Sequence, residues 1–245
     1  MTGSSVPYQR IWVFSDLHLA DTNSFLYGAF IDALSEPEND QDAVVFAGDI
    51  FEIFVGNSTY FHQKHQGFIT ALKTLSRKKV ALYYIEGNHD FHLKKAFGEI
   101  PVQIFDAEVV IGSIYIAHGD LVDQSDSGYL RMRKFFRSAG FKKFVELLPG
   151  KAVEWIGETI ARTHEQKEGD LSFEPGSVPS VRKIFRAYAE EKKRQGFDFI
   201  ILGHCHDLDD LQPFYFNMGY PPVHRQFLYY SSESNSFKRR NFSGN

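Results

Sequence analysis

Five short apolar runs, each ending abruptly in polar residues, constrain the fold of this chain more than any other feature. They lie in "RIWVFSDLH", "DAVVFAGD", "VALYYIEGNHD", "SIYIAHGD" and "FDFIILGHCH". Each apolar run has four to six residues, which is the length of a strand buried on both faces. The sequence therefore predicts several buried strands that end in Asp, His or Asn.

Segments with helical spacing lie between these runs. Apolar side chains recur every three to four positions in residues 24–34 and 66–75. A third helix is predicted in "PSVRKIFRAYAEEKKRQG", with Ser180 as its N-cap and Gly196 as its stop. The last segment, "RQFLYYSSESNSFKRRNF", predicts a hairpin of two strands. Strands alternating with helices indicate an α/β or α+β fold with layers around sheets.

The length of 245 residues and the hydrophobic share of 43% fit one globular domain over residues 1–245. Residues 121–176 break the alternation. Helical spacing in 128–148 and 151–166 is followed there by a Gly-, Pro- and Ser-rich loop, which predicts a helical cap insertion. A net charge of -4 gives no indication of nucleic acid binding.

The location of the protein is predicted from what the sequence lacks. Cys205 is the single cysteine, so no disulfide framework is expected and a reducing compartment is compatible. The sequence has no run of about 18 apolar residues, so no membrane-spanning helix is expected. The N-terminal "MTGSSVPYQR" lacks the apolar core of an export signal, so we expect a cytoplasmic protein.

The polar strand ends predict a metal centre. Ligands gather at the carboxyl ends of strands in α/β sheets, so these side chains are expected to converge. Clustered carboxylates repel one another unless cations compensate their charge. Mixed nitrogen and oxygen donors suit a transition metal such as Mn, Fe, Zn or Co. Seven Asp, His and Asn side chains at these strand ends would be too many donors for one ion. They suit two ions that share a bridging carboxylate.

The blocks "DLH", "GD", "GNHD", "HGD" and "GHCH", in this order, resemble the five signature blocks of the calcineurin-like metallophosphoesterases. The resemblance implies a four-layer αββα sandwich with two divalent ions, Mn first and Fe or Zn as alternatives. It assigns Asp16, His18 and His206 to one ion, Asn88, His118 and His204 to the other, and Asp49 as the bridge. In such centres ions about 3.5–4 Å apart activate water and neutralise phosphate charge.

Two residues of "GNHD" receive catalytic assignments that do not involve binding an ion. His89 is free to donate a proton or a hydrogen bond to the phosphoryl oxygen or the leaving group. Asp90 is expected to fix the loop or to orient an imidazole. The remaining histidines, His62, His65, His92 and His224, are expected to be structural, and Cys205 is not expected to bind metal.

Longer stretches are similar to the bacterial UDP-2,3-diacylglucosamine hydrolases of lipid A synthesis. They are "FSDLHL", "GDIFEIFVGN", "GNHDFHL" and "HGDLVDQSDSGYLRMRKFFRS". The resemblance implies water attack on the phosphorus nearer uridine, release of UMP and 2,3-diacylglucosamine 1-phosphate, and a cap that holds two acyl chains. Substrate contacts are expected from Asp126, Tyr129, Arg133, His164 and Lys167.

The composition of the cap leaves two interpretations open. Apolar and basic residues interleave in 121–176. Such a surface is expected to contact acyl chains or a diphosphate, or to bind peripherally to the cytoplasmic face of the inner membrane. The same composition fits two amphipathic helices packed on the main domain.

Two departures from that subfamily keep a second substrate class open. His89 stands where the subfamily has Arg, and "NMGYPPVHRQFLYY" replaces a Gly-Ala-Trp-His segment. The alternative is a general phosphodiesterase or phosphomonoesterase that acts on another nucleotide-linked or phospho-substrate. A non-catalytic binding scaffold is a third hypothesis, and it is disfavoured because all seven ligand positions are kept.

Overall fold

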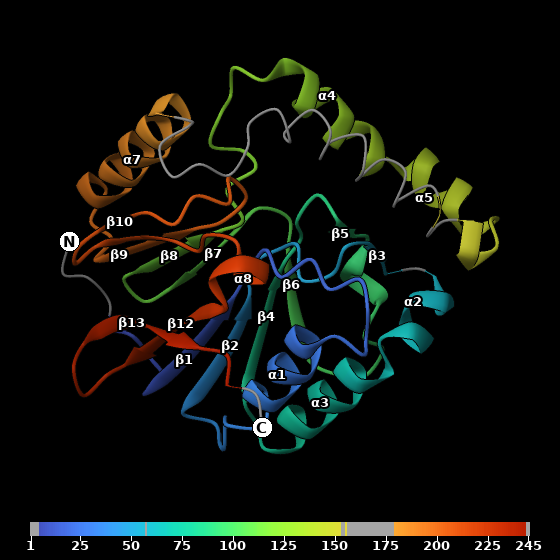
Figure 1. Ribbon diagram of the computed structural model, residues 1–245, viewed down its shortest axis with the longest axis horizontal. Coiled ribbons are helices and arrows are strands. Elements are labelled where there is room, and N and C mark those ends of the chain that lie inside the picture. The colour runs from blue at the N-terminus through green and yellow to red at the C-terminus, as the bar shows by residue number, and fades with distance from the viewer. Residues whose placement is uncertain (1–4, 57, 153–154, 156–178, 244–245) are drawn as a thin grey trace.

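Two β-sheets packed face to face form the centre of the molecule (Figure 1), for which a computed structural model describes residues 5–56, 58–152, 155 and 179–243. The larger sheet has the order β13 (Ser236–Asn241), β12 (Gln226–Ser231), β1 (Arg10–Phe14), β2 (Asp42–Phe46), β4 (Ala81–Ile85) and β6 (Val102–Phe105). The smaller sheet has the order β10 (Asp210–Leu211), β11 (Tyr215–Asn217), β9 (Phe199–Leu202), β8 (Ile114–Ala117) and β7 (Glu108–Ile111). A further two-stranded sheet joins β3 (Phe54–Val55) to β5 (Asp90–Phe91).

The five strands predicted from the apolar runs are confirmed, and they divide between the two large sheets. In the larger sheet β1, β2 and β4 are parallel neighbours. In the smaller sheet β8 and β9 are parallel neighbours. The expected convergence of strand ends therefore comes from two sheets whose carboxyl ends meet, and not from one sheet alone.

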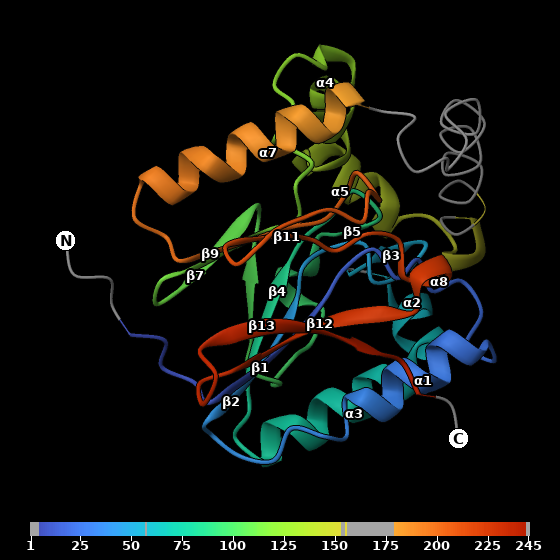
Figure 2. The same cartoon turned by 60° about the vertical axis from the view of Figure 1, so that its left-hand side comes forward.

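Helices cover the outer face of each sheet (Figure 2). The helical elements are α1 (Phe25–Ala33), α2 (Thr59–Lys64), α3 (Gln66–Arg77), the 3-10 turn Leu93–Lys95, α4 (Ser127–Phe136), α5 (Ala139–Glu146), α7 (Pro179–Arg194) and α8 (Pro221–His224). The helices α1 and α3 pack on the larger sheet, and α7 packs on the smaller one. The predicted fold class, with layers ordered helix, sheet, sheet and helix, is confirmed.

Alternation of side chains along β1 shows how one strand serves two layers. Trp12 and Phe14 pack toward α1 and α3, where Phe30 and Phe68 are also buried. Ile11 and Val13 point to the opposite face, into the core between the sheets. Every residue of β2 is buried, as expected for a parallel strand covered on both faces.

Element boundaries differ from the prediction in two places. The helix predicted over 128–148 is interrupted, because the Ser138 hydroxyl accepts the Phe141 N–H and so caps a new helix, α5. The helix α7 begins at Pro179, so Ser180 lies inside it. Gly196 ends that segment as predicted, with a φ of 102° that suits glycine.

Two further expectations concern the C-terminal segment and the cap. The predicted hairpin is confirmed, since β12 and β13 pair antiparallel. Most of the helix predicted over 151–166 lies outside the described residues, so the cap insertion over 121–176 stays a prediction. No helix in the described ranges combines the length and apolarity needed to cross a membrane.

Candidate metal centre

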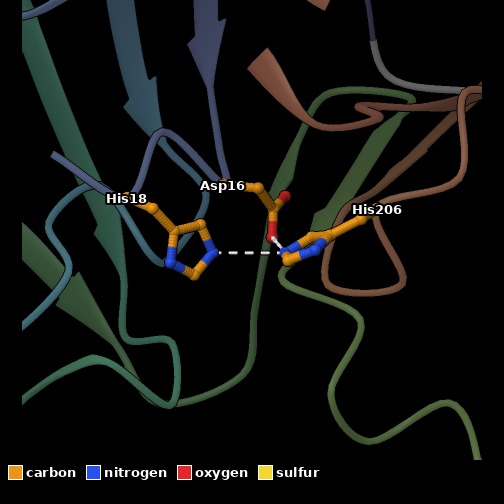
Figure 3. A group of neighbouring side chains, drawn as sticks. All are labelled: Asp16, His18 and His206. Atoms are coloured by element: carbon orange, nitrogen blue, oxygen red, sulfur yellow. Dashed lines mark hydrogen bonds and ion pairs between the residues drawn. The ribbon is translucent and has the colours of Figure 1, made fainter. Parts of the chain in front are cut away.

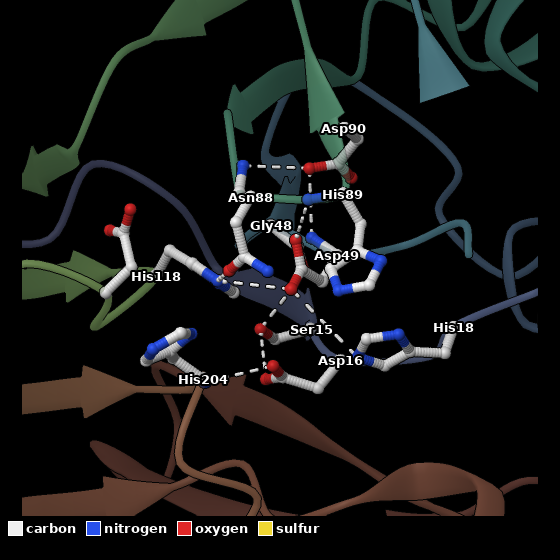
Figure 4. A network of polar contacts seen from close by, with 12 residues as sticks. Ser15, Asp16, His18, Gly48, Asp49, Asn88, His89, Asp90, His118 and His204 are labelled. Atoms are coloured by element: carbon white, nitrogen blue, oxygen red, sulfur yellow. Dashed lines mark hydrogen bonds and ion pairs between the residues drawn. The ribbon is translucent and has the colours of Figure 1, made fainter. Parts of the chain in front are cut away.

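The seven predicted ligands meet where the carboxyl ends of the two large sheets come together; Figure 4 labels six of them, and Figure 3 labels the seventh, His206. Asp16 and His18 follow β1, Asp49 follows β2 and Asn88 follows β4, all in the larger sheet. His118 follows β8, and His204 and His206 follow β9, both strands of the smaller sheet. Residues distant in the sequence are therefore adjacent in space.

Asp16, His18 and His206 form the first group, with one donor atom each inside a span of 4.8 Å (Figure 3). The Nε2 atoms of His18 and His206 lie 3.2 Å apart. His206 Nε2 is also 3.6 Å from Asp16 Oδ1. The three predicted ligands of the first ion thus point at one another.

Asp49, His118 and His204 form the second group, again with one donor atom each within 4.8 Å of the others. Asn88 joins it, because its Oδ1 lies 3.1 Å from His118 Nε2. Asp49 Oδ2 is 3.4 Å from His118 Nε2 and 4.0 Å from His18 Nε2, so this one oxygen faces both groups. That position suits the bridging role predicted for Asp49.

Glycines of the sequence blocks leave room for carboxylates from neighbouring strands. A Cβ atom on Gly87 would collide with the carboxylate of Asp49. A Cβ atom on Gly203 would collide with Asp16 and with the hydroxyl of Ser15. The glycines in "GNHD" and "GHCH" are therefore steric requirements of the clustered side chains.

Five of the predicted ligands have a backbone conformation that non-glycine residues rarely adopt. The φ angles are 53° at Asp16, 45° at His18, 53° at Asp49, 69° at His204 and 54° at His206. Such strain clusters at functional sites and persists only when the surroundings hold it. Hydrogen bonds between loops supply that support, as when Asp16 N donates to Gly48 O and His18 N to Asp49 O, each over 3.1 Å.

The electrostatics of the cluster fit a pair of divalent cations. Burial raises the pKa of Asp16 to about 6, and the neighbouring Asp49 charge adds to this effect. Burial lowers the pKa of His204 to about 4, with the charge of His118 acting in the same direction. Burial, followed by the charge of His18, also lowers the pKa of His206 well below its usual value. His204 and His206 are therefore neutral donors.

The other two ligand histidines respond in the opposite direction. Burial disfavours their charged forms too, but the hydrogen bond with Glu52 and the charge of Asp49 outweigh burial and raise the pKa of His18 to about 9. The charge of Asp49 likewise outweighs burial and raises the pKa of His118 to about 10. Cations bound here would displace protons from those two rings and compensate the carboxylates.

His89 and Asp90 lie beside the candidate ligand groups and have different contacts. The His89 N–H donates to Asp49 Oδ1 over 2.9 Å, and its ring Nδ1 donates to the carbonyl of Glu52 over 2.7 Å. Asp90 is fully buried and accepts the N–H groups of Gly87, Asp49 and Ile50. These contacts place Asp90 under the loops, where it holds Asp49 and the chain before Asn88.

Of the predicted substrate contacts, Asp126 and Tyr129 lie at the start of α4, and Arg133 lies in its last turn. The Asp126 carboxylate accepts the Tyr129 N–H and caps this helix. The Tyr129 hydroxyl donates to Asp120 over 2.9 Å, and Arg133 pairs with the same carboxylate. The Tyr129 ring also faces His204, with 5.4 Å between ring centroids. His164 and Lys167 lie outside the described residues.

Sequence reasoning missed three residues that the structure links to the site. Asp120, 96% buried, holds Tyr129 and Arg133 together. Arg137 donates to the carbonyls of Glu86 and Gly87, directly before Asn88. Glu52 Oε2 lies 3.3 Å from His18 Nδ1. Asp120 and Glu52 occupy the quoted "HGD" and "GDIFE" stretches, which were the available signal.

The residues expected to be structural have local partners or lie in the core. His62 Nε2 donates to Gly56 O over 3.0 Å, and His224 Nδ1 accepts the Tyr220 N–H over 3.0 Å. His65 is buried against Phe51. The Cys205 sulfur accepts a hydrogen bond from Asn217.

Comparison with known proteins supports the same family. Residues 9–208 match the family model described as calcineurin-like phosphoesterase. UDP-2,3-diacylglucosamine hydrolase of Photorhabdus laumondii is 27% identical over 220 residues, which are 88% of this chain and 86% of that relative. The protein of that name from Pseudomonas savastanoi is 26% identical over 206 residues, 80% of this chain and 79% of its own. A crystal structure of mutant Vps29 from Entamoeba histolytica aligns at 14% identity and a TM-score of 0.39, covering 94% and 97% of the two chains, too low a score to support the fold.

Proposed function

Because the chain belongs to the calcineurin-like phosphoesterase family and is therefore a hydrolase of phosphoester bonds, we propose that its substrate is UDP-2,3-diacylglucosamine. The products would be UMP and 2,3-diacylglucosamine 1-phosphate. The phosphohydrolase chemistry is supported by one observation above others, the Asp49 oxygen that faces both candidate ligand groups. The substrate is supported by relatives named UDP-2,3-diacylglucosamine hydrolase that align over most of the chain.

We assign the seven ligands as the sequence predicted them. Asp16, His18 and His206 would hold one ion, Asn88, His118 and His204 the other, and Asp49 both. When bound, two divalent ions supply an activated water molecule and neutralise charge on the phosphate. The family uses a dimetal centre, and we propose Mn as its metal, with Fe or Zn as alternatives that the same nitrogen and oxygen donors accept.

His89 would act on the substrate through its second ring nitrogen. A carbonyl oxygen can only accept, so the contact with Glu52 O places a proton on His89 Nδ1. Nε2 is then the ring nitrogen that can contact the substrate. As an imidazolium, His89 would donate the Nε2 proton to the leaving phosphate oxygen or hydrogen-bond a phosphoryl oxygen. Asp90 would contribute indirectly, by holding the loops that carry Asp49 and Asn88.

The helices α4 and α5 support the proposal of a lipid substrate. Phe135, Phe144 and Leu147 are 60%, 51% and 84% exposed, which is unusual for three large apolar side chains so close in sequence. Lys134 and Lys143 are exposed on the same two helices. Apolar and basic side chains together suit acyl chains and an anionic membrane surface, so peripheral membrane contact through this region is part of the proposal.

Tyr129 and Arg133 are proposed to contact the substrate from α4. Both side chains are held by Asp120, and the Tyr129 ring faces His204. Asp126 would act by capping α4. His164 and Lys167 remain proposed contacts from the cap.

The decisive experiment incubates Mn-loaded protein with UDP-2,3-diacylglucosamine in water enriched in heavy oxygen. We expect release of UMP that carries the heavy oxygen in its phosphate group. Water attack at the phosphorus nearer uridine places the new oxygen on that phosphate. Asp49→Ala serves as the inactive control. Absence of UMP, together with hydrolysis of a nitrophenyl phosphodiester, would reject the lipid substrate and leave the phosphohydrolase chemistry intact.

A second candidate, a general phosphodiesterase or phosphomonoesterase, is favoured by His89. A leaving-group acid matters most for poor leaving groups, such as the alcohols of simple esters. The measurement is the pH dependence of kcat/KM for alkyl and nitrophenyl phosphodiesters. A basic limb that disappears in His89→Ala, with the larger loss on the alkyl ester, supports this candidate.

A further inference from the structure

The Glu52 side chain lies between two functional histidines and belongs to neither candidate ligand group. Its carboxylate Oε2 is 3.3 Å from His18 Nδ1, and Oε1 is 4.0 Å from His89 Nδ1. The main-chain carbonyl of the same residue accepts from His89 Nδ1 over 2.7 Å. One residue therefore contacts a predicted metal ligand and the predicted proton donor at the same time.

A third cation site is one explanation of this cluster, because donor atoms of His18, Glu52 and His89 lie within 4.8 Å of one another. The hydrogen bonds argue against it. His89 Nδ1 donates to a carbonyl, so it carries a proton and has no lone pair for a metal. His18 Nδ1 likewise faces the Glu52 carboxylate. The cluster is better explained as a hydrogen-bonded support for the two rings.

The contact with Glu52 determines which nitrogen His18 presents to the candidate centre. A proton on Nδ1 that points to Glu52 leaves the lone pair on Nε2. That atom lies 3.2 Å from His206 Nε2 and 4.0 Å from Asp49 Oδ2, inside the cluster. The second nitrogen of a metal-binding histidine usually donates to such a partner, which fixes the tautomer and the ring orientation. Support is needed here because His18 has a φ of 45°.

We propose that Glu52 is a positioning residue for both histidines. Its carboxylate holds His18 so that Nε2 faces the first candidate ion, and its carbonyl holds His89 so that Nε2 faces the substrate. This inference rests on the proposed metal assignment. It adds a residue that the sequence analysis left out of the site.

The two contacts can be separated by mutation, because Glu52→Ala removes the carboxylate and keeps the carbonyl. We expect the affinity for one of two Mn ions to fall about 10- to 100-fold, the usual effect of losing such a partner, while the other ion binds as before. Glu52→Gln keeps an oxygen that can accept from His18, so it should restore most of the affinity. At saturating Mn, the KM of Glu52→Ala for a phosphodiester should stay near that of the wild type.

Metal titration by calorimetry measures both affinities, and electron paramagnetic resonance reports whether bound Mn is isolated or paired. Glu52→Ala at intermediate Mn concentration should give the signal of isolated Mn where the wild type gives that of a coupled pair. Glu38→Ala is the matched control, since its carboxylate is 68% exposed and pairs with Arg10, away from the candidate centre.

Three results would overturn the proposal. The first is wild-type affinity for both ions in Glu52→Ala. The second is an equal loss of both ions together with a lower melting temperature of the metal-free protein, which would indicate a general structural role. The third is a Glu52→Gln variant as weak as Glu52→Ala. Failure of the proposed substrate is a separate outcome, because wild-type protein would then release no UMP while the Mn affinities still change as expected.

Discussion

The hydroxyl of Tyr84 donates to Asp90 Oδ2 over 2.6 Å, and both side chains are fully buried beneath the candidate centre. Asp90 also accepts the N–H groups of Gly87, Asp49 and Ile50. Four donors on one carboxylate join the end of β4 to the loop after β2. The contact between Tyr84 and Asp90 therefore fixes the relative position of two loops that carry predicted ligands.

Removing the Asp90 carboxylate should lower the free energy of unfolding more than removing the Tyr84 hydroxyl. Tyr84→Phe deletes one hydrogen bond, so we expect a loss of about 1–3 kcal/mol in the free energy of unfolding. Asp90→Ala leaves three buried N–H groups without a partner and should cost about 3 kcal/mol or more. Urea unfolding of metal-free protein measures both values. The double variant tests the coupling, and strict additivity of the two losses would contradict it.

Arg137 connects α4 to the chain that leads into Asn88. Its Nη2 donates to the carbonyls of Glu86 and Gly87, each over 2.9 Å, and its Nη1 donates to the carbonyl of Asp106 over 3.0 Å. Arg137→Lys keeps the charge but cannot reach these acceptors together. We expect kcat/KM to fall about tenfold, equal to about 1.4 kcal/mol, with a change of metal affinity in the second group. Arg131→Lys, on the exposed part of the same helix, is the control and should behave as the wild type.

His65 should make the fold sensitive to acid. Its ring is 1% exposed and 4.0 Å from Phe51, and neither ring nitrogen has a hydrogen-bond partner among the described residues. Burial, with a smaller effect of the Lys64 charge, lowers its pKa to about 3. The unfolded chain takes up the proton near its ordinary pKa of about 6.5, so this stabilisation is complete above that value and is lost as the pH falls below it.

The matched variants are His65→Phe and His65→Leu, which remove the titrating ring. Wild-type protein should lose stability relative to either variant by up to about 1.4 kcal/mol per pH unit below about pH 6.5. His65→Phe should also gain about 1–3 kcal/mol at neutral pH, because two buried nitrogens no longer lack partners. Denaturant unfolding of metal-free protein across the acidic range checks both statements. Parallel stability curves for the wild type and the variants would refute the assignment.

Two arginines of α7 hold the loop that carries His206. Arg182 Nε donates to Asp207 over 2.6 Å, and Arg186 Nε and Nη2 donate to Asp209 over 2.8 and 2.6 Å. Their side chains are 33% and 40% exposed, so solvent screens both pairs. Replacing both with Ala should cost roughly 1–2 kcal/mol and weaken Mn binding by the first group.

Salt dependence distinguishes this contribution from lost packing. The difference between the double variant and the wild type should shrink in about 1 M salt, where the screening length is about 3 Å. Lys193→Ala is the control, because its pair with Asp198 is more exposed and should contribute little. A difference that stays constant with salt would mean that the arginines act through packing.

The strands could be predicted, and the candidate ligands proposed, because both depend on local sequence. Apolar runs such as Val44–Phe46 define a buried strand by themselves, and a polar residue such as Asp49 at the end of a run has few structural uses. The division of β1 and β9 between two sheets could not be derived from that pattern. A buried parallel strand has the same composition in either sheet, so only the family resemblance indicated four layers.

The supporting residues could not be predicted because their roles depend on tertiary contacts. Glu52 resembles any loop acid in the sequence, and only the fold brings His18 and His89 to it. The pairing of Arg133, a proposed substrate contact, with Asp120 follows from how α4 lies against the loop after β8. The interruption of the helix at Ser138 was missed because apolar spacing continues on both sides of this N-cap residue.

The two large sheets pack face to face, their loops meet on the edge where the predicted ligands lie, and each ligand group draws residues from both sheets. Two bound ions would therefore add crosslinks between halves that also adhere through a shared apolar core and through polar contacts such as that of Arg239 with Asp210. Chelation should then loosen the whole sandwich as well as stop catalysis. We expect the melting temperature to rise with Mn concentration. Each ion at a hundredfold excess over its Kd should add about 2.7 kcal/mol to the free energy of unfolding. For a cell, metal supply would set the lifetime of this protein as well as its rate.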